Sequence, residues 1–151
     1  MASAQIVYAS MTGNTQEMAE TIEENLADLG VETTLTEMTQ AVASDFEQAD
    51  ICIIAAYTYS DGGPGLLPDE ADGFFEDLEA LDLSGKVYGV CGSGDTFYDD
   101  FAVAVDMFDQ ALSKTGAKRA TDLLKINLAP ETDEDFAKLD KFAQDLAAAA
   151  E

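Results

Sequence analysis

The 151-residue chain contains no histidine and no tryptophan, and it has only two cysteines and three prolines. The missing histidine removes the side chain that most often acts as a general base or zinc ligand near neutral pH. Cys52 and Cys91 lie in apolar, strand-like runs, and their spacing fits no zinc pattern. We therefore expect no metal site, and two thiols that are buried and reduced rather than joined in a disulfide.

Positive charge is scarce and unevenly placed. Residues 1–85 contain 18 acidic residues and no Lys or Arg, and all seven bases follow, starting at Lys86. The formal net charge of −24 argues against nucleic acid and anionic membranes as partners, because both are bound through cationic patches. Such a field attracts a protein with a basic face. Adaptation to high salt is the alternative explanation, and both can hold.

Long hydrophobic runs are also absent. No apolar stretch approaches the roughly 20 residues of a membrane span, and the N-terminus lacks the basic and apolar regions of a signal peptide. A chain of this length suits one domain with its own core. We expect a single domain over residues 1–151, acting as a monomer in the cytoplasm.

The chain does contain a regular alternation of apolar strands and amphipathic helices. Five strands that alternate with helices predict an α/β fold with a doubly wound, open parallel sheet and helices on both faces. The expected strands are 4–9, 31–38, 50–57, 86–92 and 117–128; the expected helices are 15–29, 69–81, 100–115 and 133–149, with a helical turn at 45–48.

Three loops follow the carboxyl ends of expected strands, where ligands of such sheets bind. The first loop, residues 10–15, leads into a helix whose unsatisfied N–H groups and dipole favour an anion such as phosphate. An ordinary turn with Thr15 as helix N-cap is the alternative. The other loops, 58–68 and 93–99, carry Tyr59 and Tyr98, which can stack on a flat ring. Together these loops predict a mononucleotide-type ligand.

Several segments resemble the flavodoxins, and the resemblance covers the whole chain. They are IVYASMTGNTQEMA at 6–19, AYTYSDG, LPDE at 67–70 and CGSGDTFYDDF at 91–101. The resemblance implies a short-chain, flavodoxin-like fold with strand order 2-1-3-4-5 and non-covalently bound FMN at the switch point. It also implies one-electron transfer between a reductase and an acceptor enzyme, without substrate turnover of its own.

The resemblance further implies which residues hold FMN. The loop at 10–15 surrounds the phosphate with Thr58 nearby, Tyr98 and Tyr59 cover the two ring faces, and backbone groups at Ser93, Asp95 and Ala102 meet the pyrimidine edge. Ser60 departs from the family, where many members have Gly. The expected cofactor-binding residues are Ser10, Met11, Thr12, Gly13, Asn14, Thr15, Thr58, Tyr59, Ser60, Asp61, Ser93, Gly94, Asp95, Tyr98, Phe101 and Ala102.

The charge adds an expectation about the cofactor. Reduction adds negative charge to a flavin, and the cation-free first 85 residues disfavour that charge, so we expect a low-potential carrier. The expected partners are a flavodoxin or ferredoxin reductase and acceptor redox enzymes with basic docking faces. An FMN-dependent quinone reductase of the same fold, and an acidic binding module without flavin, are the alternative functions.

Overall fold

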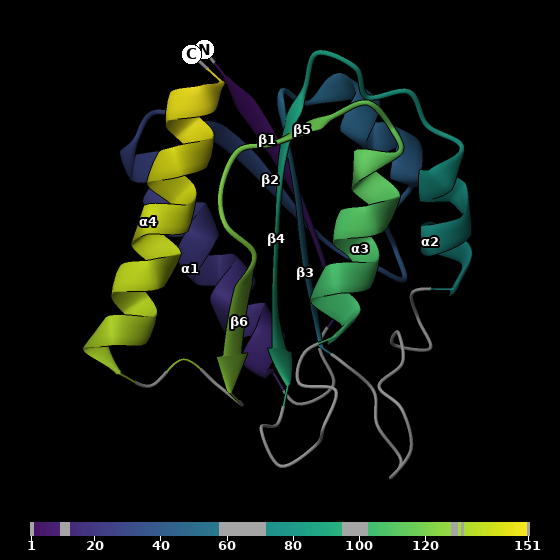
Figure 1. Ribbon diagram of the computed structural model, residues 1–151. Helices are drawn as coiled ribbons and strands as arrows, with labels where there is room; N and C mark the ends of the chain where they lie inside the picture. Colours follow the sequence, from purple (N-terminus) through teal and green to yellow (C-terminus); the bar gives the residue numbers. More distant parts are fainter. Residues whose placement is uncertain are drawn as a thin grey trace, which may run out of the picture.

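A parallel sheet forms the centre of the computed structural model, with helices on both of its faces (Figure 1). Its strands are β1 (Ser3–Ala9), β2 (Glu32–Glu37), β3 (Ile51–Tyr57), β4 (Val87–Gly94), β5 (Lys118–Arg119) and β6 (Leu124–Asn127). The order is β2-β1-β3-β4-β5, and β6 also pairs with β4. The predicted order 2-1-3-4-5 is confirmed.

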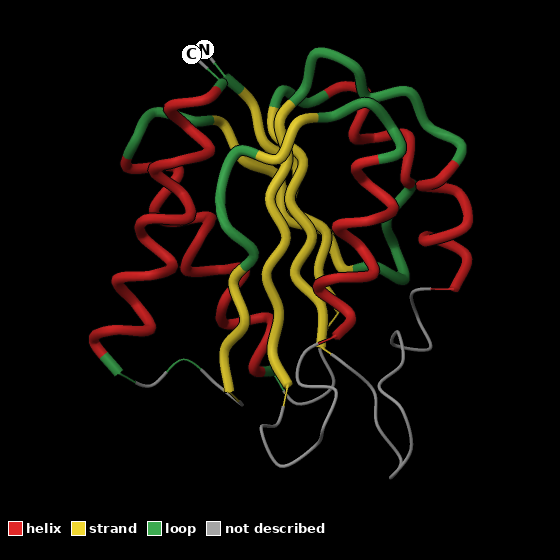
Figure 2. The backbone as a smooth tube through the Cα atoms, in the orientation of Figure 1, coloured by secondary structure: helices red, strands yellow, loops and turns green. Residues whose placement is uncertain are grey.

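The structure describes residues 2–9, 13–57, 72–94, 103–127, 130 and 132–150. The helices are α1 (Asn14–Asp28), α2 (Asp72–Glu79), α3 (Val103–Ser113) and α4 (Asp133–Ala149), with a 3-10 helix η1 at Ala43–Gln48. Figures 1 and 2 show α1 and α4 on one side of the sheet and α2 and α3 on the other. No helix in the described ranges is long and apolar enough to cross a membrane.

The position of β3 at the centre of the sheet explains why its sequence is continuously apolar. Residues 51–56 are all buried, and they alternate between the two faces of the sheet. Ile51, Ile53 and Ala55 belong to the core under α1 and α4, whereas Cys52, Ile54 and Ala56 belong to the core under α2 and α3. A parallel strand covered on both faces is expected to read this way.

The two cysteines are free and fully buried, as predicted. Cys52 lies in the core under α2 and α3, and Cys91 lies in the core on the opposite face. Because the sheet separates them, these two thiols do not face one another.

The expected strand at 117–128 is in fact interrupted, so that prediction was wrong in detail. Arg119 pairs with Tyr88, and Leu124 pairs with Cys91. Four residues, 120–123, therefore oppose two residues of β4, and the surplus cannot join the ladder. The Thr121 hydroxyl instead donates to Asp145 of α4 at 2.9 Å. β5 and β6 share the one sheet position predicted for the fifth strand.

Candidate functional site

The carboxyl ends of three adjacent strands meet at one edge of the sheet. Ala9 of β1 pairs with Ala56 of β3, and Ala56 pairs with Gly92 of β4. The connection after β1 leads to β2 on one side, whereas β3 and β4 lie on the other side, so this edge contains the switch in strand order. Ligands of open parallel sheets bind at this place.

Helix α1 begins at this edge without a side-chain cap. Its N-cap is Gly13, whose φ of 93° is a left-handed conformation that glycine adopts freely. The Gly13 carbonyl accepts the first helical bond, from the Glu17 N–H at 3.0 Å. The alternative of Thr15 as N-cap is therefore wrong, because Thr15 lies inside the first turn.

Helix α4, unlike α1, begins with a side-chain cap. Its N-cap Thr132 accepts from the Asp135 N–H at 3.1 Å, and the two residues complete a capping box. The N-cap of α1 is a glycine, which has no side chain that could make such a bond. The first-turn N–H groups and the positive end of the α1 dipole suit a phosphate, so this end of the site fits FMN.

Two buried hydroxyls join α1 to β4 beside this helix start. The Thr15 Oγ1 and Ser93 Oγ atoms lie 2.8 Å apart, across 78 residues of sequence. Thr15 is 1% exposed and Ser93 is 5% exposed. The structure thus brings together two residues that the sequence placed in separate ligand-facing loops.

Ser93 and Gly94 belong to strand β4 rather than to the loop predicted at 93–99. Ser93 pairs with Tyr57 on one side and with Ile126 on the other, and Gly94 pairs with Asn127. Pairing on both edges at Ser93 and on one edge at Gly94 extends β4 two residues past the expected end. The backbone of Ser93 is therefore fixed by the sheet.

Gly92 was not among the predicted site residues, although it precedes Ser93 directly. A Cβ atom at this position would overlap the carbonyl oxygen of Ala56 and lie 2.7 Å from Cγ2 of Val105. Only glycine thus allows β3, β4 and α3 to approach this closely beside the site. The CGSG sequence is a signal that the segment contains a close approach, but not of which glycine makes it.

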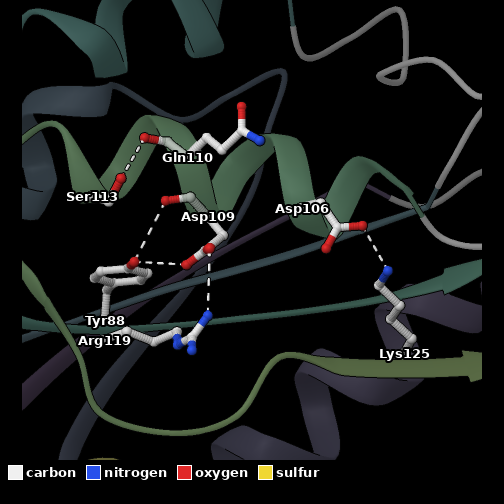
Figure 3. Close-up of polar contacts among 7 residues, drawn as sticks. All are labelled: Tyr88, Asp106, Asp109, Gln110, Ser113, Arg119 and Lys125. Carbon is white, nitrogen blue, oxygen red and sulfur yellow. Dashed lines mark hydrogen bonds and ion pairs between the residues drawn. The ribbon is translucent and has the colours of Figure 1, made fainter.

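Polar contacts hold α3 against the strands, as Figure 3 shows. The Tyr88 hydroxyl donates to Asp109 Oδ1 at 2.6 Å, and Arg119 pairs with Asp109 at 3.4 Å. Lys125 of β6 pairs with Asp106 in the first turn of α3 at 2.6 Å. Burial, followed by the bond to Asp109, raises the pKa of Tyr88. The contacts of Asp109 hold the middle of α3, and the pair with Asp106 holds its first turn, which follows the expected flavin loop.

The structure describes five predicted cofactor-binding positions: Gly13, Asn14 and Thr15 at the start of α1, and Ser93 and Gly94 at the end of β4. The others lie outside the described residues and stay predictions. They are Ser10, Met11, Thr12, Thr58, Tyr59, Ser60, Asp61, Asp95, Tyr98, Phe101 and Ala102.

Comparisons with known proteins agree with this site. A family model described as flavodoxin matches residues 6–141. The chain is 40% identical over 144 residues to the probable flavodoxin 1 of Bacillus subtilis strain 168, covering 95% of this chain and 89% of that protein.

Solved structures give the same result. A Streptococcus pneumonia TIGR4 flavodoxin is 51% identical with a TM-score of 0.92, over 98% of this chain and 99% of that one. A short-chain flavodoxin associated with a bacterial microcompartment is 44% identical with a TM-score of 0.94, over 100% of both chains. This chain therefore belongs to the flavodoxin family, whose members are FMN-binding electron carriers and not substrate-converting enzymes.

Proposed function

We propose that this protein carries electrons on FMN from a reductase to acceptor enzymes in the cytoplasm. The observation that supports this most directly is the start of α1 at the switch-point edge, where glycine is the N-cap and the Thr15 and Ser93 hydroxyls are buried beside it. FMN supplies the redox chemistry, because its ring accepts and releases electrons one at a time. The protein supplies binding, orientation and electrostatics.

The proposed residue roles follow from the resemblance to the flavodoxins. Gly13 and Thr15, with Ser10, Thr12 and Asn14, bind the phosphate through N–H and O–H groups. Tyr59 and Tyr98 cover the two faces of the ring and exclude water from it. The backbone near Ser93 and Gly94 is held by the sheet and orients the pyrimidine edge. The remaining predicted positions, Met11, Thr58, Ser60, Asp61, Asp95, Phe101 and Ala102, complete the proposed pocket.

The charge asymmetry supports a partner with a basic face. Within the described ranges, the four ion pairs all join residues between 106 and 145. Lys86, the first cation, donates to the Ala49 carbonyl at 2.7 Å. Among the residues that the structure describes, none of these ion pairs involves an acid of the first 85 residues, so that part of the chain carries a negative field that steers a basic partner.

Related sequences also occur inside redox enzymes. The chain is 31% identical to part of the sulfite reductase flavoprotein component of Aliivibrio fischeri, over 97% of this chain and 25% of that protein. Flavodoxin-like domains thus occur together with reductases, which supports a reductase as the electron donor. The two free, buried thiols are in keeping with a reducing compartment.

The first experiment is a titration of the apoprotein with FMN, followed by anaerobic reduction monitored in the visible spectrum. We expect a bound flavin that is reduced by a flavodoxin or ferredoxin reductase and reoxidised by an acceptor. A protein that binds no flavin would instead be an acidic binding module. Steady NADPH-dependent quinone turnover by the protein alone would identify a quinone reductase.

Salt dependence tests the proposed docking. We expect the second-order rate of electron transfer from a basic-faced reductase to fall by about tenfold or more when salt rises from low to roughly 0.5 M, because salt screens exposed charge. The control is the melting temperature at the same salt concentrations, which detects a salt requirement for folding. Rates that do not change with ionic strength would contradict steering.

A further inference from the structure

We propose that Ser93 is a positioning residue for phosphate recognition, and that its hydroxyl donates to Thr15 so that the Thr15 proton points at the phosphate of FMN. The inference rests on the proposed phosphate-binding role of Thr15. It assigns to the Ser93 side chain a part that the resemblance gives only to its backbone. It also predicts selectivity for the phosphorylated form of the flavin.

The geometry fixes both hydroxyls in place. Ser93 sits in β4, paired with β3 and β6, and Thr15 sits in the first turn of α1. Their oxygens are 2.8 Å apart, and both side chains are at least nine-tenths buried. Water has little access to either oxygen, so each hydroxyl depends on its protein neighbour and on a ligand for its hydrogen bonds.

The number of protons decides what the contact can do. Each hydroxyl carries one proton and two acceptor positions, and only one proton can lie in the shared hydrogen bond. If Thr15 donates to Ser93, its proton is used and cannot reach an anion. If Ser93 donates, the Thr15 proton is free for an anion at the helix start. A bound phosphate therefore favours the arrangement in which Ser93 donates to Thr15 and Thr15 donates to the phosphate.

The chain of hydrogen bonds also strengthens the last donor. A hydroxyl that accepts a hydrogen bond becomes a better donor, and buried networks show this effect more than exposed ones. A hydrogen bond to a charged group corresponds to roughly 10- to 100-fold in affinity. Losing the Ser93 hydroxyl should remove part of that factor, because Thr15 remains but is less well oriented.

Riboflavin provides the probe, since it has the ring of FMN without the phosphate. Apoprotein is titrated with FMN and with riboflavin by fluorescence, and the ratio of the two dissociation constants reports the phosphate contribution. Any change at the ring affects both ligands and cancels. The variants are Ser93→Ala, Thr15→Val and their double, with Ser93→Thr as the variant that keeps a hydroxyl.

Thr115→Val is the matched control. Thr115 is also a buried threonine, 3% exposed, and its hydroxyl donates to the Leu112 carbonyl at 2.5 Å in the turn after α3. The change removes a buried threonine hydroxyl as Thr15→Val does, but away from the start of α1. Urea denaturation of every apoprotein confirms that it is folded at the titration conditions.

We expect Ser93→Ala to reduce the preference for FMN over riboflavin by roughly 3- to 10-fold, and Thr15→Val to reduce it at least as much. The double variant should resemble Thr15→Val alone, because Ser93 acts through Thr15. Ser93→Thr and Thr115→Val should keep the native ratio.

Three results would overturn the inference: an unchanged ratio in Ser93→Ala, an unchanged ratio in Thr15→Val, or independent losses that multiply in the double variant. If the ratio is unchanged in Ser93→Ala and FMN still binds with native affinity, the proposed carrier function is unaffected. Ser93 would then serve only to connect α1 to β4. A native protein that binds no FMN would remove the proposed function and this inference together.

Discussion

Replacing Gly92 with alanine is expected to lower the free energy of unfolding by about 3 kcal/mol, at the upper end of the usual cost of overpacking. The new Cβ would overlap the Ala56 carbonyl oxygen, which belongs to the backbone of the central strand and cannot move aside cheaply. It would also press on Val105 of α3 at 2.7 Å. Because this point lies beside Ser93, affinity for FMN should fall as well.

Urea denaturation of the apoprotein measures the effect, and two other glycines serve as controls. Gly73 lies in α2 with no atom within 4 Å of a built Cβ, so Gly73→Ala should be neutral or stabilise by up to about 1 kcal/mol. Gly89→Ala would meet the ends of the Phe142 and Leu146 side chains at 2.8 and 2.9 Å and should be intermediate. A Gly92→Ala protein as stable as Gly73→Ala would show that the strands can separate without cost.

Raising the pH above about 9 is expected to destabilise the protein steeply, because three buried groups resist ionisation. Burial raises the pKa of both thiols, Cys52 and Cys91, to about 12. Burial and the bond to Asp109 raise the pKa of Tyr88. In the unfolded chain a thiol ionises near about 8.5 and a tyrosine near about 10.

The direction of the change in stability with pH follows from the number of protons that each state binds. Between the unfolded and folded pKa values the folded protein holds more protons, so its stability falls as the pH rises. The contribution of each thiol is fully present below about pH 8.5 and is lost as the pH approaches 12. The slope is about 1.4 kcal/mol per pH unit for each fully titrating group.

Denaturation curves at half-unit steps from pH 8 to 11 test this expectation. The variant with both Cys52→Ala and Cys91→Ala should show a flatter decline between about pH 9 and 10, the range in which an unfolded thiol is ionised and an unfolded tyrosine is mostly not. Tyr88→Phe should change the decline only at higher pH. Identical slopes with and without the thiols would mean that the thiols ionise in the folded state.

The order of strands and helices could be predicted because it depends on local patterns. The continuous apolar run of β3 reflects burial on both faces, and α4 begins at its predicted residue, where Thr132 caps it, and also ends at its predicted residue. The close approach at Gly92 and the contact between Thr15 and Ser93 could not be predicted. Each depends on how distant elements are placed, and the two hydroxyls are 78 residues apart.

The break in the last strand has the same origin. Within residues 117–128, Ala120 and Asp122 are poor strand formers, but they do not show where pairing with the neighbouring strand stops and where it resumes. The break arises because β4 offers two residues where the chain supplies four. Register between strands is a property of the assembled sheet, so a prediction from one segment misses it.

The break between β5 and β6 is also a place where residues can be inserted into the chain. β5 and β6 hold separate stretches of β4, so residues added between Arg119 and Leu124 would leave both sets of strand pairs intact. Longer loops cost little additional closure entropy. A short peptide tag inserted beside the exposed Asp122 would therefore leave the fold unchanged. Such a tag could fix the protein to an electrode surface by the side of its sheet, away from the start of α1.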